Sequence, residues 1–129
     1  MDPLYPAAVT ALTLLLYLVV AGNAGRNRAK HKIAAPAMTG HPDFERANRV
    51  QMNTLEQMVC FLPAMWLYAW SLSAVWAAAV GLVWIVGRVI YSFAYISDPA
   101  RRGPGMMISL LALIWLLGGA LCGIGLKLV

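Results

Sequence analysis

Charged residues are scarce in this chain of 129 residues. Asp, Glu, Lys and Arg together make up 12% of it, whereas apolar residues make up 61%. A typical globular domain carries about twice that share of charge, and a soluble domain this small has too much surface for so apolar a composition. We therefore predict an integral membrane protein, and the length predicts a single domain over residues 1–129.

Cysteine and histidine are also rare, with two residues of each. Cys60 and Cys122 both lie in apolar runs, and the sequence contains neither a CxxC pair nor a cluster of cysteine with histidine. The sequence therefore predicts no disulfide framework and no metal site. We interpret both cysteines as small apolar side chains within the membrane helices.

Acidic residues number five against ten lysines and arginines. The basic residues gather between apolar segments, where control of membrane topology explains them better than nucleic-acid binding does. The first six residues, MDPLYP, carry Asp2 and no basic residue, unlike the start of a cleavable signal peptide. We expect the first apolar segment to be retained as a membrane helix and expect no nucleic-acid partner.

Four segments have the length of membrane helices, because a helix needs about 20 residues to cross about 30 Å of hydrocarbon. The apolar stretch from Met58 to Gly87 is too long for one span, and Ser71 and Ser73 mark the only plausible turn in it. Counting back about 20–25 residues from Trp70 places the start of the second helix in the range Pro42 to Ala47. The sequence predicts an all-α, four-helix bundle with helices at residues 4–22, 44–70, 74–96 and 106–128.

Two of the predicted loops are basic. The first, at residues 23–42, carries several lysines and arginines and the breakers Gly25, Pro36 and Gly40, and the third follows residue 96 and carries Arg101 and Arg102. The positive-inside rule places both loops in the cytoplasm and both termini on the opposite side. In a bacterium, the host membrane would be the inner membrane.

The second predicted helix carries a polar face. At 100° per residue, Arg49, Asn53 and Glu56 lie at about 0°, 40° and −20°. Ionisable residues at membrane depth are costly and functional by default. Because Arg49 and Glu56 are about 10 Å apart along the axis, we expect them not to pair readily, and the gap suits a small zwitterion. Gln51 falls near 200°, so it is either structural or part of a pocket between neighbouring subunits.

A purely structural interpretation of this face is also open. Glu45 and Arg49 are four residues apart and could pair at the interface. Glu56 could be neutralised by Arg88 on the next helix, and Asn53 could join two helices by hydrogen bonding.

The third predicted helix places Arg88, Tyr91 and Tyr95 on one face at its cytoplasmic end. Taken singly, the tyrosines fit an interfacial aromatic belt and Arg88 fits a snorkelling side chain. Facing the polar row of the second helix, they favour a shared polar cavity with Arg101 and Arg102 at its mouth. An arginine beside a thiol favours the nucleophilic thiolate.

The run FERANRVQMNTLEQ, residues 44–57, resembles the signature of the MAPEG family, which includes microsomal glutathione transferases and leukotriene C4 synthase. The similarity continues through RVIYSFAY, residues 88–95, to Arg102 and covers nearly the whole chain. It implies a homotrimer of four-helix subunits that binds glutathione between subunits near the cytoplasmic side. The implied reaction is conjugation of glutathione to hydrophobic electrophiles, with possible reduction of lipid hydroperoxides, and it needs no metal.

The resemblance also implies roles for individual residues. Arg102 would stabilise the glutathione thiolate. The substrate-binding set would be Arg28, Arg49, Gln51, Asn53, Glu56, Arg88, Tyr91 and Tyr95. Two departures stand out: Gln57 replaces a tyrosine of the leukotriene-synthase-like members, and Ala29 and Lys30 leave the paired arginines of some relatives incomplete.

Two other functions remain open at this stage. A non-catalytic lipid-binding or scaffold member of the same fold is one, although Tyr91, Tyr95 and Arg102 argue against it. A small four-helix multidrug transporter is the other, but such transporters use a glutamate in the first helix, and Leu4 to Gly22 contains no acidic residue.

Overall fold

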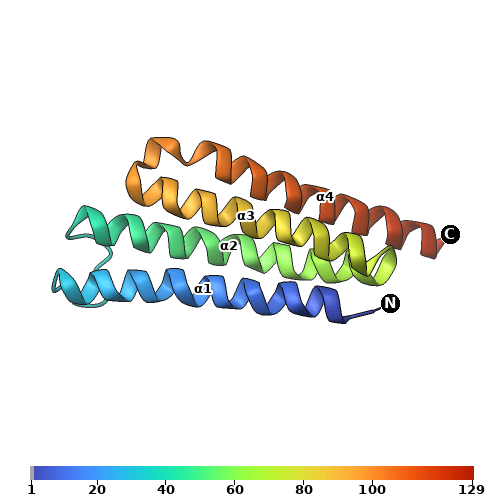
Figure 1. Ribbon diagram of the computed structural model, residues 1–129, viewed down its shortest axis with the longest axis horizontal. Coiled ribbons are helices and arrows are strands. Elements are labelled where there is room, and N and C mark those ends of the chain that lie inside the picture. The colour runs from blue at the N-terminus through green and yellow to red at the C-terminus, as the bar shows by residue number, and fades with distance from the viewer. Residues whose placement is uncertain (1) are drawn as a thin grey trace.

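The computed structural model describes residues 2–129 as a bundle of long helices (Figure 1). The elements are α1 (Leu4–Lys30), α2 (Pro42–Ser71), α3 (Ala74–Ser97), the short 3-10 helix η1 (Pro99–Arg101) and α4 (Gly103–Leu128). Helices α2 and α3 form the centre, since each packs on the other and on both α1 and α4. The prediction of an all-α, four-helix architecture is confirmed, and residues 2–129 contain no strand.

Three segments are long and apolar enough to cross a membrane: α1, α3 and the segment Pro99–Leu128 that contains α4. Helix α2 is equally long at 30 residues. Its first half, however, carries the charged side chains of Asp43, Glu45, Arg46, Arg49 and Glu56. The prediction of four membrane-spanning helices is thus confirmed for three of them by length and composition.

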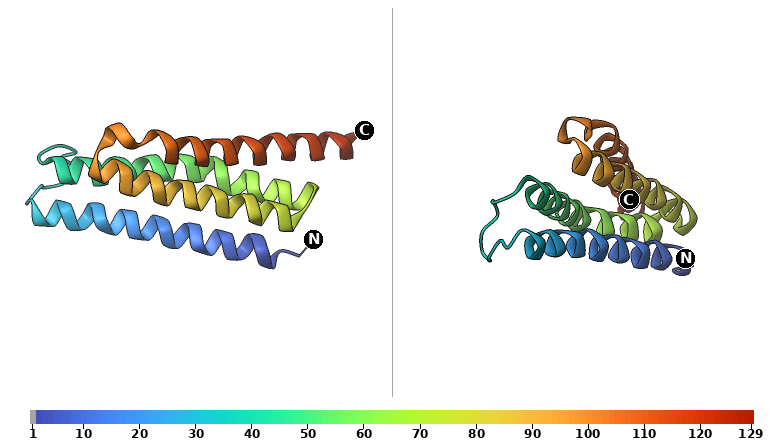
Figure 2. Two further views of the ribbon diagram at one scale, coloured as in Figure 1. Left: turned by 45° about the horizontal axis from the view of Figure 1, so that its top comes forward. Right: turned by 60° about the vertical axis from the view of Figure 1, so that its left-hand side comes forward.

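The connections alternate between the two ends of the bundle. The α1–α2 and α3–α4 connections lie at one end, and the α2–α3 turn lies at the other end with both termini (Figures 1 and 2). Both basic loops therefore share one end, as the sequence predicted. The side of the membrane that this end faces stays a prediction.

Helix α1 is longer than predicted, because residues 23–30 are helical and only residues 31–41 connect α1 to α2. The helix ends in a Schellman motif at Lys32, whose φ is +54°. The Ile33 N–H donates to the Arg28 carbonyl (2.9 Å) and the Lys32 N–H to the Ala29 carbonyl (3.2 Å). A glycine usually occupies this left-handed position, whereas here a lysine does. Gly25 lies inside α1, so the prediction that it breaks the helix is wrong.

The other helix ends match the prediction to within three residues. Helix α2 begins at Pro42 after His41, whose Nδ1 accepts a hydrogen bond from the Asp43 N–H (3.1 Å). Ser73 caps α3 by accepting from the Trp76 N–H at 3.2 Å, as its type and place predict. The third loop contains η1, and α4 begins at Gly103 rather than at residue 106.

The main core lies where α2, α3 and α4 meet. Phe61 and Trp84 are fully buried and stack with ring centroids 4.0 Å apart and planes 5° apart. Met65 and Leu116 are fully buried in the same cluster. This packing fixes the register of α2 against α3 and so positions the polar residues one to two turns away.

Helices α3 and α4 approach each other through two glycines. A Cβ added to Gly105 would lie 2.7 Å from the Tyr91 Cα, and one added to Gly87 would lie 2.7 Å from the Ser109 backbone nitrogen. Both distances are shorter than van der Waals contact with backbone, which cannot move as a side chain can. The start of α4, and with it Arg102, is therefore held close to Tyr91.

We expect Gly105→Ala to lower the thermal stability of the purified protein, because the added methyl forces α4 away from α3. Overpacking of this kind costs about 1–3 kcal/mol. Gly118→Ala in the same helix is the matched control, since nothing lies within 4 Å of its added Cβ. Thermal unfolding in detergent measures both variants, and equal midpoints would contradict the close approach.

Candidate functional site

The polar face of α2 contains an ion pair. Arg49 Nη1 lies 3.5 Å from Glu56 Oε1, and both side chains are about half-exposed. The prediction that these residues cannot readily pair is therefore wrong. Their backbones are two turns apart, but the two long side chains extend along the helix surface toward each other and close the gap.

Asn53 lies between these two residues in the sequence and faces inward. It is 9% exposed, and its Oδ1 is buried without a hydrogen-bond partner among residues 2–129. A buried polar atom without a partner is costly. The amide oxygen therefore has an unused capacity to accept a hydrogen bond beside the Arg49–Glu56 pair.

Arg88 on α3 is fully buried. Its Nη2 donates to Thr54 Oγ1 at 3.0 Å, and its guanidinium lies 4.1 Å from the centre of the Tyr91 ring. Nε and Nη1 have no hydrogen-bond partner within the described chain. Both structural alternatives for Arg88 are therefore wrong: the side chain does not snorkel to the surface, and Glu56 pairs with Arg49 instead.

The two tyrosines predicted for the site lie together on α3. Tyr91 is buried and Tyr95 is partly exposed, with ring centroids 5.6 Å apart. Arg102 lies at the start of α4, where its Nη1 donates to the Pro99 carbonyl at 2.9 Å. The guanidinium of Arg102 is exposed at the loop end of the bundle, three residues before the close approach of Gly105 to Tyr91.

Arg28 and Gln51 lie elsewhere, between α1 and α2. Arg28 donates to the Ala37 carbonyl (2.9 Å) and lies 4.5 Å from the centre of the Phe44 ring. Gln51 Nε2 donates to Tyr17 Oη on α1 at 3.2 Å. The single chain therefore divides the predicted residues into two groups, one at the α2–α3–α4 side and one at the α1–α2 side.

A model of the MAPEG family matches residues 6–122 of this chain. That range includes every residue of both groups. The chain belongs to the MAPEG family. The resemblance inferred from residues 44–57 is thereby confirmed, and membership of this membrane family supports an integral membrane protein.

Similar MAPEG chains include proteins with named activities. Human microsomal glutathione S-transferase 2 is 39% identical over 114 residues, which cover 87% of this chain and 78% of the human one. Leukotriene C4 synthase of Cavia porcellus is 35% identical over 111 residues, 86% and 73% of the two chains. An uncharacterized protein of Synechocystis is 46% identical over 121 residues, 94% and 88% of the two.

Gln57, where this MAPEG chain differs from the tyrosine of the leukotriene-synthase-like members, has a defined hydrogen-bond partner. Trp84 Nε1 donates to Gln57 Oε1 at 3.0 Å, and Trp84 is the ring that stacks on Phe61. Gln57 is therefore engaged with the core of the chain. Its amide links the polar strip of α2, which consists of Arg49, Asn53 and Glu56, to the packing of α2 against α3.

Three contributors to the polar region were missed from the sequence: Thr54, Tyr17 and Trp84. Thr54 is fully buried and accepts the hydrogen bond from Arg88, yet a threonine in an apolar helix carries no distinctive signal. Trp84 precedes Arg88 by four residues, so it shares a helix face with it. That spacing was the one signal that could have placed Trp84 beside the polar strip.

Proposed function

We propose that this chain is a membrane glutathione transferase that conjugates glutathione to hydrophobic electrophiles. One observation carries the proposal: along one helix, a MAPEG chain presents a cation (Arg49), a buried amide oxygen (Asn53) without a partner among residues 2–129, and an anion (Glu56). A tripeptide with two carboxylates and one ammonium group matches that order of charges. The relatives named as glutathione S-transferase and leukotriene C4 synthase support the same reaction class.

In this proposal glutathione replaces the Arg49–Glu56 ion pair. An exposed ion pair contributes at most about 1 kcal/mol, so opening it costs little. Glu56 would then bind the ammonium group and Arg49 a carboxylate, while Asn53 Oδ1 accepts a peptide N–H. Arg88, together with Tyr91 and Tyr95, would form the side of the pocket that α3 contributes.

The proposed site is shared between subunits of a homotrimer. Arg28 on α1 and Gln51 on α2 make their contacts between α1 and α2 in the single chain, with partners other than the Arg49–Glu56 pair. A neighbouring chain that packs with its α1–α2 side against the polar strip would add both residues to one pocket. The basic end of the bundle would lie in the cytoplasm, where glutathione is abundant.

The shared site predicts complementation between inactive variants. Arg28→Ala/Gln51→Ala and Arg49→Ala/Glu56→Gln damage different sides of the pocket, so mixed trimers should regain some sites with both sides intact. Co-expression should restore part of the conjugation activity that each variant lacks alone. Co-expressing Arg49→Ala with Glu56→Gln is the control, because both changes lie on the same side and no intact site can form. Equal activity in the two mixtures would contradict a shared site.

The proposed chemistry requires a thiolate and proximity. Arg102 would stabilise the sulfur anion of bound glutathione, and an apolar electrophile would enter from the bilayer. The sulfur forms a bond to the electrophilic carbon, and the leaving group departs with the bonding electrons. Holding both reactants together supplies much of the rate enhancement.

The direct test is a conjugation assay on the purified chain with glutathione and a chloronitrobenzene electrophile. We expect saturable formation of the thioether and, in stopped-flow mixing with glutathione alone, the absorbance of a bound thiolate. The proposal would be overturned if the protein binds no glutathione and shows neither the thioether nor the thiolate absorbance. A hydroperoxide substrate in the same assay tests the peroxidase activity.

A second candidate function, lipid binding without catalysis, is favoured by an apolar groove of 580 Å³ between α1 and α3. Leu16, Val19 and Phe93 are among its lining residues, with Asn23 and Arg26 at the loop end, and none of the predicted site residues contributes. An apolar tail with a polar head would fit this lining. Lipid that copurifies, without a thiolate signal on mixing with glutathione, would favour this function over the transferase.

A further inference from the structure

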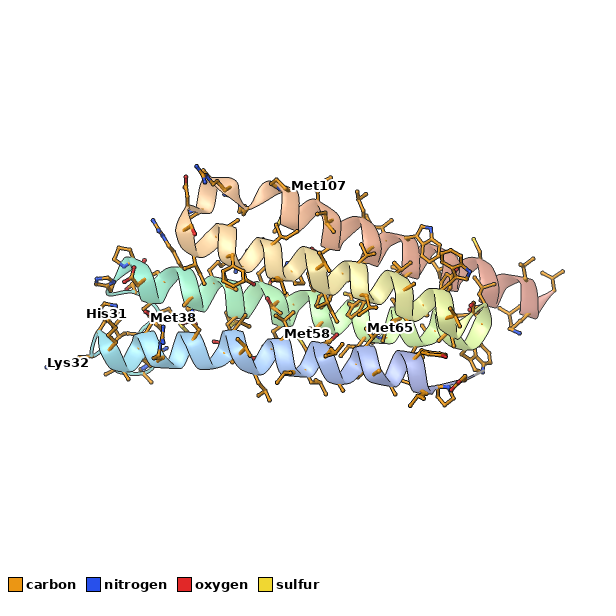
Figure 3. The ribbon with its side chains drawn as sticks, viewed as in Figure 1. His31, Lys32, Met38, Met58, Met65 and Met107 are labelled. Atoms are coloured by element: carbon orange, nitrogen blue, oxygen red, sulfur yellow. The ribbon has the colours of Figure 1, made fainter. Side chains whose placement is uncertain are left out.

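Three side chains that can bind a metal ion meet where α1 ends and α2 begins: His31, His41 and Asp43. One ligand atom from each lies within 4.8 Å of the others. Figure 3 shows His31 at this end of the bundle. We propose that these residues form a binding site for a divalent transition metal ion of the zinc class.

The distances between ligand atoms suit a shared ion. Asp43 Oδ2 lies 3.5 Å from His31 Nε2 and 3.8 Å from His41 Nδ1. Two ligands that are each about 2.1 Å from one zinc ion lie about 3.4 Å apart in tetrahedral geometry. The two imidazoles are stacked, with centroids 3.5 Å apart and planes 12° apart, so a small rotation of the rings away from each other would direct both lone pairs at the ion.

The protein itself leaves this cluster incompletely bonded. His31 Nε2 is buried and makes no hydrogen bond within residues 2–129. His41 Nδ1 accepts from the Asp43 backbone N–H, a cap that a metal ion would replace.

The ligand types select the class of ion. Two imidazole nitrogens and one carboxylate oxygen suit zinc, copper, nickel or cobalt, whereas magnesium and calcium prefer oxygen ligands throughout. The neighbouring Lys30 and Lys32 weaken binding of ions that are held by charge alone. The C-terminal end of α1, where His31 lies, favours a cation through the helix dipole. Three protein ligands leave at least one position for water.

Metal binding would join the two helix ends that flank the loop of residues 31–41. Arg28 lies one turn before His31 and donates to the Ala37 carbonyl inside this loop. A bound ion would therefore restrict the movement of this loop, whose Ala37 carbonyl accepts the hydrogen bond from Arg28. Binding of the ion itself does not depend on the proposed glutathione transferase function.

The test uses the full chain in detergent, purified without a histidine tag. His31 and His41 are the only two histidines of the chain. When Cu²⁺ is added, any coupling to an imidazole nitrogen in its electron paramagnetic resonance spectrum therefore reports this site. Titration with Zn²⁺ in a calorimeter should show one ion per chain. His41→Ser and Asp43→Asn should each weaken binding at least about tenfold, because each removes one ligand.

The variants separate loss of a ligand from loss of fold. Serine at position 41 still accepts the hydrogen bond from the Asp43 N–H, so His41→Ser keeps the start of α2. Asp2→Asn, at the opposite end of the bundle, should bind like the parent chain. The proposal is overturned if the parent binds no stoichiometric Zn²⁺, or if binding persists in both His41→Ser and Asp43→Asn. Binding through Cys60 or Cys122 would give the second result.

Discussion

Arg102→Ala should lower the turnover number of glutathione conjugation by about 100-fold while changing glutathione affinity far less. Lowering a thiol pKa by about two units corresponds to about 2.7 kcal/mol at 1.36 kcal/mol per unit, and one guanidinium in a partly dry site can supply that stabilisation. Arg102 is exposed, and its side chain hydrogen-bonds only to the Pro99 carbonyl among the described residues. Its side chain is therefore free to turn toward a bound thiolate. Steady-state kinetics with a chloronitrobenzene electrophile measure the effect.

The neighbouring residue offers the control for this experiment. Arg101→Ala removes the same charge from the same loop, and Arg101 is also exposed, so it should leave turnover nearly unchanged. Stopped-flow absorbance should show less bound thiolate in Arg102→Ala alone. An unchanged turnover number in Arg102→Ala, or an equal loss in both variants, would refute the assigned role.

The second large effect is expected for Glu56→Gln, which should weaken glutathione binding about 10- to 100-fold. Hydrogen bonds to charged groups contribute about 1.5–3 kcal/mol, and the change removes the carboxylate proposed to bind the ammonium group. Turnover at saturating glutathione should fall much less. Equilibrium binding measured by calorimetry in detergent gives the affinity directly.

An analogue of glutathione without the α-amino group sharpens this prediction. The analogue should bind the parent chain weakly, and it should bind Glu56→Gln about as weakly as it binds the parent. The reason is that the ammonium group it lacks is the proposed partner of Glu56. Glu45→Gln is the matched control in the same helix, since Glu45 Oε2 accepts from the Gly40 N–H (3.4 Å) and is not part of the Arg49–Glu56 pair. A Glu56→Gln chain that binds both ligands as the parent does would contradict the proposed pose.

The helices could be predicted because apolar runs of membrane length and local caps specify them. Ser73 marks the start of α3 by its side chain alone. The end of α1 could not be predicted in the same way, because a lysine occupies the left-handed position that usually holds glycine. Lys32 adopts it because the Schellman hydrogen bonds to Arg28 and Ala29 hold it there, and these form only when the connecting loop folds back.

The polar residues could be predicted as a set but not in their pairing. Helical angles place Arg49 and Glu56 on one face correctly, yet the axial rise says nothing of how far two long side chains extend. The hydrogen bond from Arg88 to Thr54 depends on the rotation of α3 against α2. Packing of Phe61 on Trp84 sets that rotation, and no local pattern in either helix specifies it.

The burial of Arg88 has a consequence for how the chain enters the membrane. A lone α3 in lipid would carry an unpartnered guanidinium at depth, which is costly, and a lone α2 would carry its own charged strip. Only Leu72 and Ser73 separate the two helices, and Thr54 on α2 is the hydrogen-bond partner that Arg88 needs. We therefore expect α2 and α3 to leave the insertion machinery as one helical hairpin, with the arginine already sheltered between them.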